Sequence, residues 1–290
     1  MRSTGPNDWL QPVPSFGERL STVFETRGQL CLGIDPHAFL LGEWGLPDTA
    51  AGVREFGMRA VAAATENVGI VKPQVAFFER HGSAGYAALE AVITAARDAG
   101  LLVIADVKRG DIGSTIDAYG AAWLSTGSPL EVDAMTAVAY QGVGSLAGTI
   151  GLAAENGKGV FVLAATSNPE AFETQTAVRT TGASVAAGIV DEVEAFNDGS
   201  ASLGSVGVVI GATVNLTDFG IRQEALGLTP ILAPGFGEQG ARLADAETLY
   251  GATSSNIVVN VGRSVLRAGP GGIGRALAAA AAELDEALVR

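Results

Sequence analysis

Short apolar segments, rich in β-branched residues, recur along the chain and alternate with longer segments of helical periodicity. Because the apolar positions run continuously instead of alternating with polar ones, we expect strands that are buried on both faces, as in a parallel sheet. The expected strands are residues 30–35, 69–74, 102–108, 132–138, 160–167, 206–212, 230–235 and 256–263.

Segments between these strands place apolar residues on one face, as amphipathic helices do. The expected helices are residues 49–67, 83–99, 114–124 and 239–251, the second of them ended by Gly100. The longer stretch 170–205 is expected to hold one helix with loops. Before the first strand we expect an extra N-terminal helix, with Ser15 as its N-cap and Glu18 completing a capping box.

Eight strand–helix units without a linker predict an α/β protein with a (β/α)8 TIM barrel. We expect one domain over residues 1–290, made of an N-terminal extension (1–29), the barrel core (30–266) and a C-terminal helix (267–290). A doubly wound open sheet is the alternative. No Gly-x-Gly-x-x-Gly follows the first strand, which weakens a dinucleotide-binding version, and that pattern occurs only after the seventh strand, at 235–240.

Amino-acid composition and net charge limit the cellular location and the binding partners that we expect. The 290 residues include 31 acidic and 18 basic side chains, a formal net charge of −13. This balance argues against binding to nucleic acid or to an anionic membrane surface. The single cysteine, Cys31, lies in an apolar segment and is expected to be buried. Without a secretory signal pattern or a long apolar stretch, we expect a soluble cytoplasmic protein.

Charged residues gather where the strands end, which in such a barrel is the face that carries the active site. Asp35 ends the first strand, Lys72 lies on the second, and Asp106 and Lys108 end the third, with Asp111 shortly after. Asp106 and Lys108 point the same way because they are two apart. Carboxylates alternating with ammoniums keep the lysines protonated, so such a lysine is a proton donor and a poor Schiff-base nucleophile. A carboxylate in this array could destabilise an anionic group of a substrate.

Glycine-rich segments follow strands seven and eight, which is where this fold often binds phosphate. They are residues 233–240 and 260–264, and they contain Gln239 and Arg263 as side-chain donors. No convincing cluster of metal ligands is present, which favours chemistry without a metal. His37 and His81 are the only histidines, and we expect loop or packing roles for them.

The segment DVKRGDIGST, residues 106–115, resembles the D-x-K-x-x-D-I-x-x-T signature of the orotidine 5′-phosphate decarboxylase family. Five further segments occur in that family's order: LGIDP, VKPQ, ATSNP, LAPGFGEQG and VGRS. The residues around the signature are similar to those of the longer bacterial branch of the family. The resemblance covers roughly residues 30–266. It implies decarboxylation of orotidine 5′-monophosphate (OMP) to uridine 5′-monophosphate (UMP) without a cofactor, the last step of de novo pyrimidine synthesis, by a homodimer.

The resemblance also implies a role for each matching residue. Lys108 would stabilise and protonate the C6 carbanion, and Asp106 would lie against the leaving carboxylate. Asp111 would reach into the partner's site. Substrate contacts would come from Asp35 and Lys72 to the ribose, Ile112 and Thr115 beside Asp111, Ser167 to the pyrimidine, Pro234 along the pocket wall, and Gln239, Gly262 and Arg263 to the phosphate.

Two other functions stay open at this point. One is a metal-dependent decarboxylase or aldolase that acts on a sugar phosphate, which would need carboxylates free to bind Mg²⁺. The other is a non-catalytic nucleotide-binding barrel, which would be expected to lack at least one of Lys72, Asp106, Lys108 and Asp111, and none is missing. Residues 170–205 have no counterpart in the compact branch of the family, so no role carries over to them.

Overall fold

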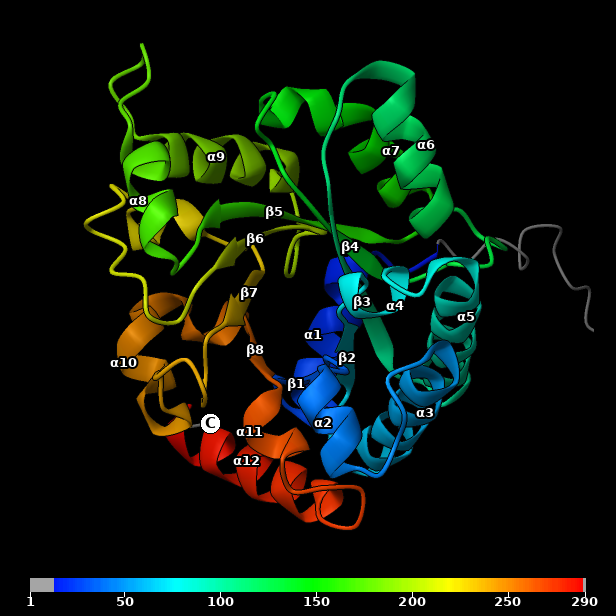
Figure 1. The fold of residues 1–290 in the computed structure, drawn as a ribbon. Coiled ribbons are helices and arrows are strands. Elements are labelled where there is room, and N and C mark those ends of the chain that lie inside the picture. The colour runs from blue at the N-terminus through cyan, green and yellow to red at the C-terminus, as the bar shows by residue number, and fades with distance from the viewer. Residues whose placement is uncertain (1–12, 289–290) are drawn as a thin grey trace, which may run out of the picture.

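A computed structural model describes residues 13–288. Eight parallel strands pair in sequence order, and β8 pairs with β1 to close a barrel. The helices form a ring around the strands (Figure 1). The predicted (β/α)8 barrel is therefore confirmed, and the open doubly wound sheet is wrong. The strands are β1 (Leu30–Ile34), β2 (Ile70–Pro73), β3 (Leu102–Arg109), β4 (Ala134–Ala137), β5 (Gly159–Ala165), β6 (Val206–Ile210), β7 (Ile231–Pro234) and β8 (Ile257–Val261).

The helices follow the strands in the expected alternation, with short extra helices in some loops. They are α1 (Phe16–Arg27), α2 (Ala38–Glu43), α3 (Ala50–Asn67), α4 (Ala76–Glu79), α5 (Gly82–Asp98), α6 (Gly113–Leu124), α7 (Ala147–Glu155), α8 (Pro169–Thr176), α9 (Val185–Glu194), α10 (Ala246–Tyr250), α11 (Arg263–Leu266) and α12 (Ile273–Ala287). The 3₁₀ helices are η1 (Val143–Leu146), η2 (Ala195–Asn197), η3 (Gln223–Leu226), η4 (Leu243–Asp245) and η5 (Gly251–Asn256).

The strands are buried on both faces because each face packs against a different apolar layer. Outward side chains such as Leu32 and Val103 meet the surrounding helices, while inward ones such as Ile70 and Phe161 fill the barrel. This two-sided burial explains why the strands read as continuous apolar segments.

Helix α1 closes the N-terminal end of the barrel. Its capping box is present as predicted: the Ser15 hydroxyl accepts from the Glu18 N–H, and the Glu18 carboxylate accepts from the Ser15 N–H. Phe16, Leu20 and Phe24 join the apolar cluster inside the barrel. The Phe16 ring meets Phe161 edge to face at 5.8 Å between centroids. The first part of the expected extension, residues 1–12, lies outside the described residues.

The helix predicted over 239–251 is largely wrong. Within that range only Ala246–Tyr250 is α-helical, preceded by the 3₁₀ turn Leu243–Asp245. Residues 235–241 instead form a closed glycine-rich turn, in which the Gly237 N–H donates to the Ala241 carbonyl and the Ala241 N–H donates to Gly235. Gly240 has a φ of +107°, which a right-handed helix cannot accommodate.

The stretch between β5 and β6 also differs from expectation, because it holds two α-helices instead of one. Pro169 occupies the first turn of α8, a position where its missing N–H costs nothing. The Ser184 hydroxyl caps α9 by accepting from the Ala187 N–H. Between the two helices, Val178 and Ser184 form an antiparallel bridge, which ends the first helix and sets the start of the second.

Cys31 is buried inside the barrel, as predicted. Burial raises the pKa of its thiol to about 12, so it is an apolar packing group at neutral pH. Within residues 13–288, no helix combines the length and the hydrophobicity needed to cross a membrane.

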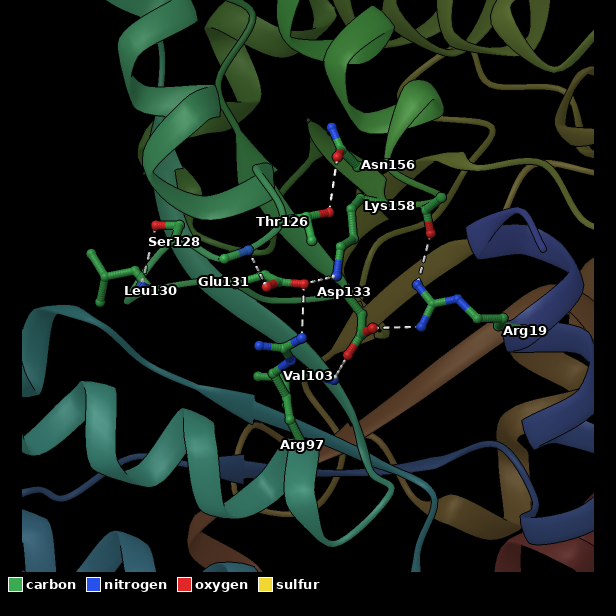
Figure 2. A network of polar contacts seen from close by, with 12 residues as sticks. Arg19, Arg97, Val103, Thr126, Ser128, Leu130, Glu131, Asp133, Asn156 and Lys158 are labelled. Atoms are coloured by element: carbon green, nitrogen blue, oxygen red, sulfur yellow. Dashed lines mark hydrogen bonds and ion pairs between the residues drawn. The ribbon is translucent and has the colours of Figure 1, made fainter. Parts of the chain in front are cut away.

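A network of buried ion pairs holds the N-terminal ends of β3, β4 and β5 together (Figure 2). The Glu131 carboxylate accepts from Lys158 at 2.8 Å and from Arg97 at 2.7 Å. Asp133 accepts from Arg19 of α1 at 2.5 Å and from the Val103 N–H at 2.9 Å. The side chains of Lys158 and Glu131 are each 8% exposed, so each charge depends on its partner.

Glu131→Gln should lower the free energy of unfolding by about 3–5 kcal/mol, because it leaves the Lys158 ammonium buried without a counter-charge. Urea denaturation of the purified variant measures this loss. Glu55→Gln is the matched control, since Glu55 pairs with Arg59 at the surface with 46% and 40% exposure, and exposed pairs of this kind contribute only about 0.3–0.5 kcal/mol. Equal, small losses in both variants would contradict a stabilising role for the network.

Candidate active site

The C-terminal ends of β1, β2 and β3 bring four charged side chains together, as the sequence predicted. The Lys72 Nζ lies 3.1 Å from Asp106 Oδ2 and 4.0 Å from Asp35 Oδ1. The Lys108 Nζ lies 2.5 Å from the other Asp106 oxygen, Oδ1. Asp106 is therefore held between two lysines, and Asp35 flanks the first of them. We call these four residues the charged array.

Burial and mutual attraction together set the protonation of the inner pair. Burial opposes ionisation of Asp106, but the Lys72 and Lys108 ammoniums outweigh it and lower the pKa of this carboxyl to about 2. Burial likewise opposes the charge on Lys72, yet Asp106 and Asp35 outweigh it and raise its pKa above the usual value. Both residues are thus charged at neutral pH, and Lys72 is unsuited to Schiff-base chemistry.

Thr136 on β4 belongs to the same cluster, although it was not among the residues predicted from the sequence. Its hydroxyl donates to Asp106 Oδ1 at 2.9 Å and accepts from the N–H groups of Val107 and Lys108 at 3.0 and 2.9 Å. The signal in the sequence was a polar residue in the middle of the apolar segment 132–138, away from the strand end where active-site residues are expected in this fold.

A cavity of about 270 Å³ opens directly over the charged array. Besides those four residues and Thr136, it is lined by three further residues that the sequence predicted, Ser167, Pro234 and Gln239. Leu163, Val209 and Leu232 supply apolar wall. The cavity thus joins a charged side to an apolar one, which suits a planar ring that carries an anionic substituent.

A second cavity, of about 370 Å³, adjoins the first and shares Asp35, Gln74, Pro234, Gln239 and Asn260 with it. Its other lining residues include Gly262 and Arg263, so the predicted phosphate residues lie together at this end. The glycine-rich turn of residues 235–241 borders this cavity. Its Gly235 lines the cavity with a φ of +118°, a backbone conformation that residues with side chains rarely adopt.

His37 borders this second cavity and has the packing contacts expected for it. Its ring contacts Phe77 and Phe39, with centroids 4.3 and 5.4 Å away. Burial lowers the pKa of His37, with a smaller contribution from the Arg263 charge, so the imidazole is neutral at physiological pH. His81 is away from both cavities, with its Nε2 3.6 Å from Asp48.

Gln175 of α8 holds the end of β5 next to Ser167. Its side-chain oxygen accepts from the Thr166 N–H at 2.9 Å, and its amide nitrogen donates to the Thr166 hydroxyl at 3.0 Å. The stretch 170–205 therefore supports a residue of the cavity wall, Thr166, although none of its own residues lines the cavity. This contact could not be predicted from the sequence, because no local pattern relates Gln175 to Thr166, nine residues earlier.

Asp111, Ile112 and Thr115 line neither cavity of their own chain. Ile112 is 61% exposed, and the Asp111 carboxylate accepts from the Ile112 N–H. A larger cavity of about 640 Å³ is lined by residues 212–217 and 220–224 with Thr248 and Leu249, and no residue of the charged array lines it. No group of three or more His, Cys, Asp or Glu placed to hold a metal ion occurs within residues 13–288.

Comparison with known proteins shows the family to which the chain belongs. Residues 28–275 match the sequence model of the "Orotidine 5'-phosphate decarboxylase / HUMPS family". The chain belongs to this family. The match spans the whole barrel and every residue of the charged array.

Relatives from actinobacteria share about half of the sequence. Orotidine 5′-phosphate decarboxylase of Streptomyces coelicolor is 50% identical over 88% of this chain and 91% of its own length. The enzyme of the same name from Salinispora tropica is 49% identical over 89% and 92%. The resemblance to the longer bacterial branch of the family is confirmed.

Solved structures of family members have the same fold. A Streptomyces avermitilis crystal structure, described as a candidate orotidine 5′-phosphate decarboxylase, superposes with a TM-score of 0.92 at 47% identity, covering 97% of this chain and 98% of that one. OMP decarboxylase of Leishmania donovani gives a TM-score of 0.76 at 29% identity, covering 95% and 99%.

Gln175→Leu should expose the Thr166 N–H to solvent, because it removes the side-chain oxygen that accepts from it. Hydrogen–deuterium exchange of peptides that span residues 160–168 should then become faster. Glu173→Gln, an exposed change on the same helix, is the control and should leave that exchange unchanged. Unaltered exchange in Gln175→Leu would show that the helix does not hold the strand end.

Proposed function

We propose that this chain converts OMP to UMP and CO2, and that the charged array carries the reaction. The observation that carries the proposal is the buried Asp106 carboxylate held between Lys72 and Lys108 on one side of a cavity that also has an apolar wall. The identity to enzymes named orotidine 5′-phosphate decarboxylase supports it.

The array acts on the carboxylate of the substrate. Asp106, ionised at neutral pH, would lie against the C6 carboxylate of OMP and repel it. The bond from C6 to the carboxylate then breaks, CO2 leaves, and the electron pair stays on C6. The repulsion is relieved as charge moves from the carboxylate to C6, where the preorganised lysine charge stabilises it.

Lys108 completes the reaction by giving its Nζ proton to C6. Its side chain is 44% exposed, whereas that of Lys72 is 5% exposed, so Lys108 has the freedom to reach the ring. Lys72 and Asp35 would bind the ribose hydroxyls. Ser167 would hydrogen-bond the pyrimidine.

The second cavity would hold the phosphate of the same nucleotide. Arg263, Gln239 and the Gly262 backbone line it, and Pro234 lies between the two cavities. Binding the remote phosphate supplies energy that keeps the reacting carboxylate against Asp106. The local positive charge is what attracts the substrate, since the chain as a whole has a net charge of −13.

We further propose that the reaction needs no cofactor or metal. Both Asp106 oxygens already accept hydrogen bonds, Oδ2 from Lys72 and Oδ1 from Lys108 and Thr136, so this carboxylate is not free to bind Mg²⁺. A metal-dependent reaction on a sugar phosphate is the competing function. The loss of OMP absorbance in the presence of EDTA separates the two, because turnover only after adding a divalent metal would favour the competitor.

Lys108→Ala should lower kcat for OMP by at least about 10³-fold, since it removes both the proton donor and a charge that stabilises the carbanion. The absorbance assay measures turnover. Titration calorimetry with UMP is the control, because the phosphate end is untouched and binding should persist. Near-normal turnover in this variant would rule out Lys108 as the proton donor.

We propose that the enzyme is a homodimer in which Asp111 enters the partner's site. Two observations support a second copy at this surface. Asp111, Ile112 and Thr115 line neither cavity of their own chain, and large apolar side chains are exposed nearby, Ile112 at 61% and Tyr140 at 86%. Segments 109–112 and 138–140 lie side by side, since the Val138 N–H donates to the Arg109 carbonyl, and exposed apolar side chains that lie together mark interaction surfaces.

Mixing inactive Asp111→Ala with inactive Lys108→Ala should restore activity through hybrid dimers. One of the two sites in a hybrid then has both residues intact, so random exchange gives about a quarter of wild-type activity. A mixture of Lys108→Ala with the Lys108→Ala/Asp111→Ala double variant is the control and should stay inactive. No recovery, once subunit exchange is shown by mass-tagged chains, would place Asp111 in its own chain's site.

We propose a cytoplasmic location for the enzyme. The only cysteine, Cys31, is buried with a raised thiol pKa, so no intrachain disulfide stabilises the fold and an oxidising compartment is not needed. No nucleic-acid or membrane partner is proposed, because the acidic net charge disfavours both.

A further inference from the structure

Strand β3 bulges at the point where it presents the two reacting residues. Ala105 pairs with Met135 of β4, but the next pair joins Arg109 to Ala137. Three residues of β3, 106–108, therefore lie opposite the single β4 residue Thr136. A bulge of this kind bends the strand and redirects the side chains that it carries.

The bulge imposes an unusual backbone conformation on Lys108. Its φ is +48°, and within residues 13–288 it is the one residue other than glycine with a positive φ. Residues with side chains seldom adopt this region and stay there only where the surrounding structure holds them. Something must therefore fix the backbone of 107–108.

The Thr136 hydroxyl supplies that restraint. It accepts from the N–H groups of both Val107 and Lys108, at 3.0 and 2.9 Å, and it donates its own hydrogen to Asp106 Oδ1 at 2.9 Å. A hydroxyl has one hydrogen and two lone pairs, so all three are in use. Thr136 is 1% exposed, and no bond remains for a ligand even though the residue borders the cavity.

We propose that Thr136 is a positioning residue: its one hydroxyl locks the β3 bulge and the Asp106 carboxylate together, so that Lys108 and Asp106 keep their mutual geometry during the reaction. The proposal rests on the proposed function, because decarboxylation of OMP is the reaction measured. Thr136 acts through Asp106 and Lys108 and does not touch the substrate.

The alternatives for holding the bulge are weaker. A regular strand would bond the N–H groups of residues 107 and 108 to backbone carbonyls, but the shifted register leaves them to a side chain. A glycine at 108 would relieve the strain, yet it would remove the ammonium that faces Asp106. The hydroxyl at 136 therefore satisfies the backbone while leaving residue 108 to be a lysine.

Thr136→Val and Thr136→Ser test this role. Valine keeps the shape of threonine and removes all three hydrogen bonds, whereas serine keeps the hydroxyl. We expect Thr136→Val to lower kcat for OMP on the order of a hundredfold, the loss typical of reacting groups misplaced by about 1 Å. KM should change by no more than about threefold, because the phosphate end is intact. Thr136→Ser should restore kcat to within about fivefold of wild type, since it retains the three bonds.

Amide exchange at Val107 and Lys108 provides a readout that does not need activity. It should be faster in Thr136→Val than in wild type and near wild type in Thr136→Ser. Circular dichroism verifies folding, and Thr136→Ala replaces the valine variant if that variant does not fold. Wild-type kcat in Thr136→Val, or equal losses in the valine and serine variants, would overturn the proposal. If wild type itself fails to act on OMP, the proposed function is wrong, and amide exchange still decides whether Thr136 holds the bulge.

Discussion

The ion pair between Lys72 and Asp106 is the constraint on which the active site depends. Both side chains are more than nine-tenths buried, and neither could carry its charge there without the other. Asp35 adds a second negative charge beside Lys72, and Lys108 and Thr136 add a positive charge and a hydrogen bond to Asp106. Contacts from β1 to β4 thus offset the desolvation of the two buried charges. These contacts are possible because β1, β2, β3 and β4 are consecutive parallel neighbours in the sheet, so that their C-terminal ends lie side by side at one rim.

The two ends of the barrel use buried charge in different ways. At the N-terminal end, Glu131 and Asp133 each accept from donors at short distance, and Arg19 of α1 binds Asp133, so the network serves stability (Figure 2). At the C-terminal end the pairing is incomplete. Asp35 Oδ1 is buried without a hydrogen-bond partner, and Lys108 is 44% exposed toward the cavity. Unsatisfied polar groups at such a place are available to a ligand.

The same division explains how an acidic protein can recognise an anion. The net charge of −13 is spread over the molecule, whereas Lys72, Lys108 and Arg263 face the two adjoining cavities. A few cations in a partly desolvated cavity outweigh distant surface charges, which water and salt screen. The sign of the local field, and not the total charge, therefore governs binding of a nucleotide.

The order of strands and helices, the capping box of α1 and the charged array were readable from the sequence alone. These features depend on spacing along the chain: apolar periodicity marks buried faces, and Asp106 and Lys108 share a side because they are two residues apart. Tertiary structure decided the rest. The role of Thr136 depends on the register between β3 and β4, and that of Gln175 on how α8 returns to β5. The turn at 235–241 replaced a predicted helix because its hydrogen bonds close within the turn. Register and loop closure join residues that are distant in sequence, so no local pattern carries them.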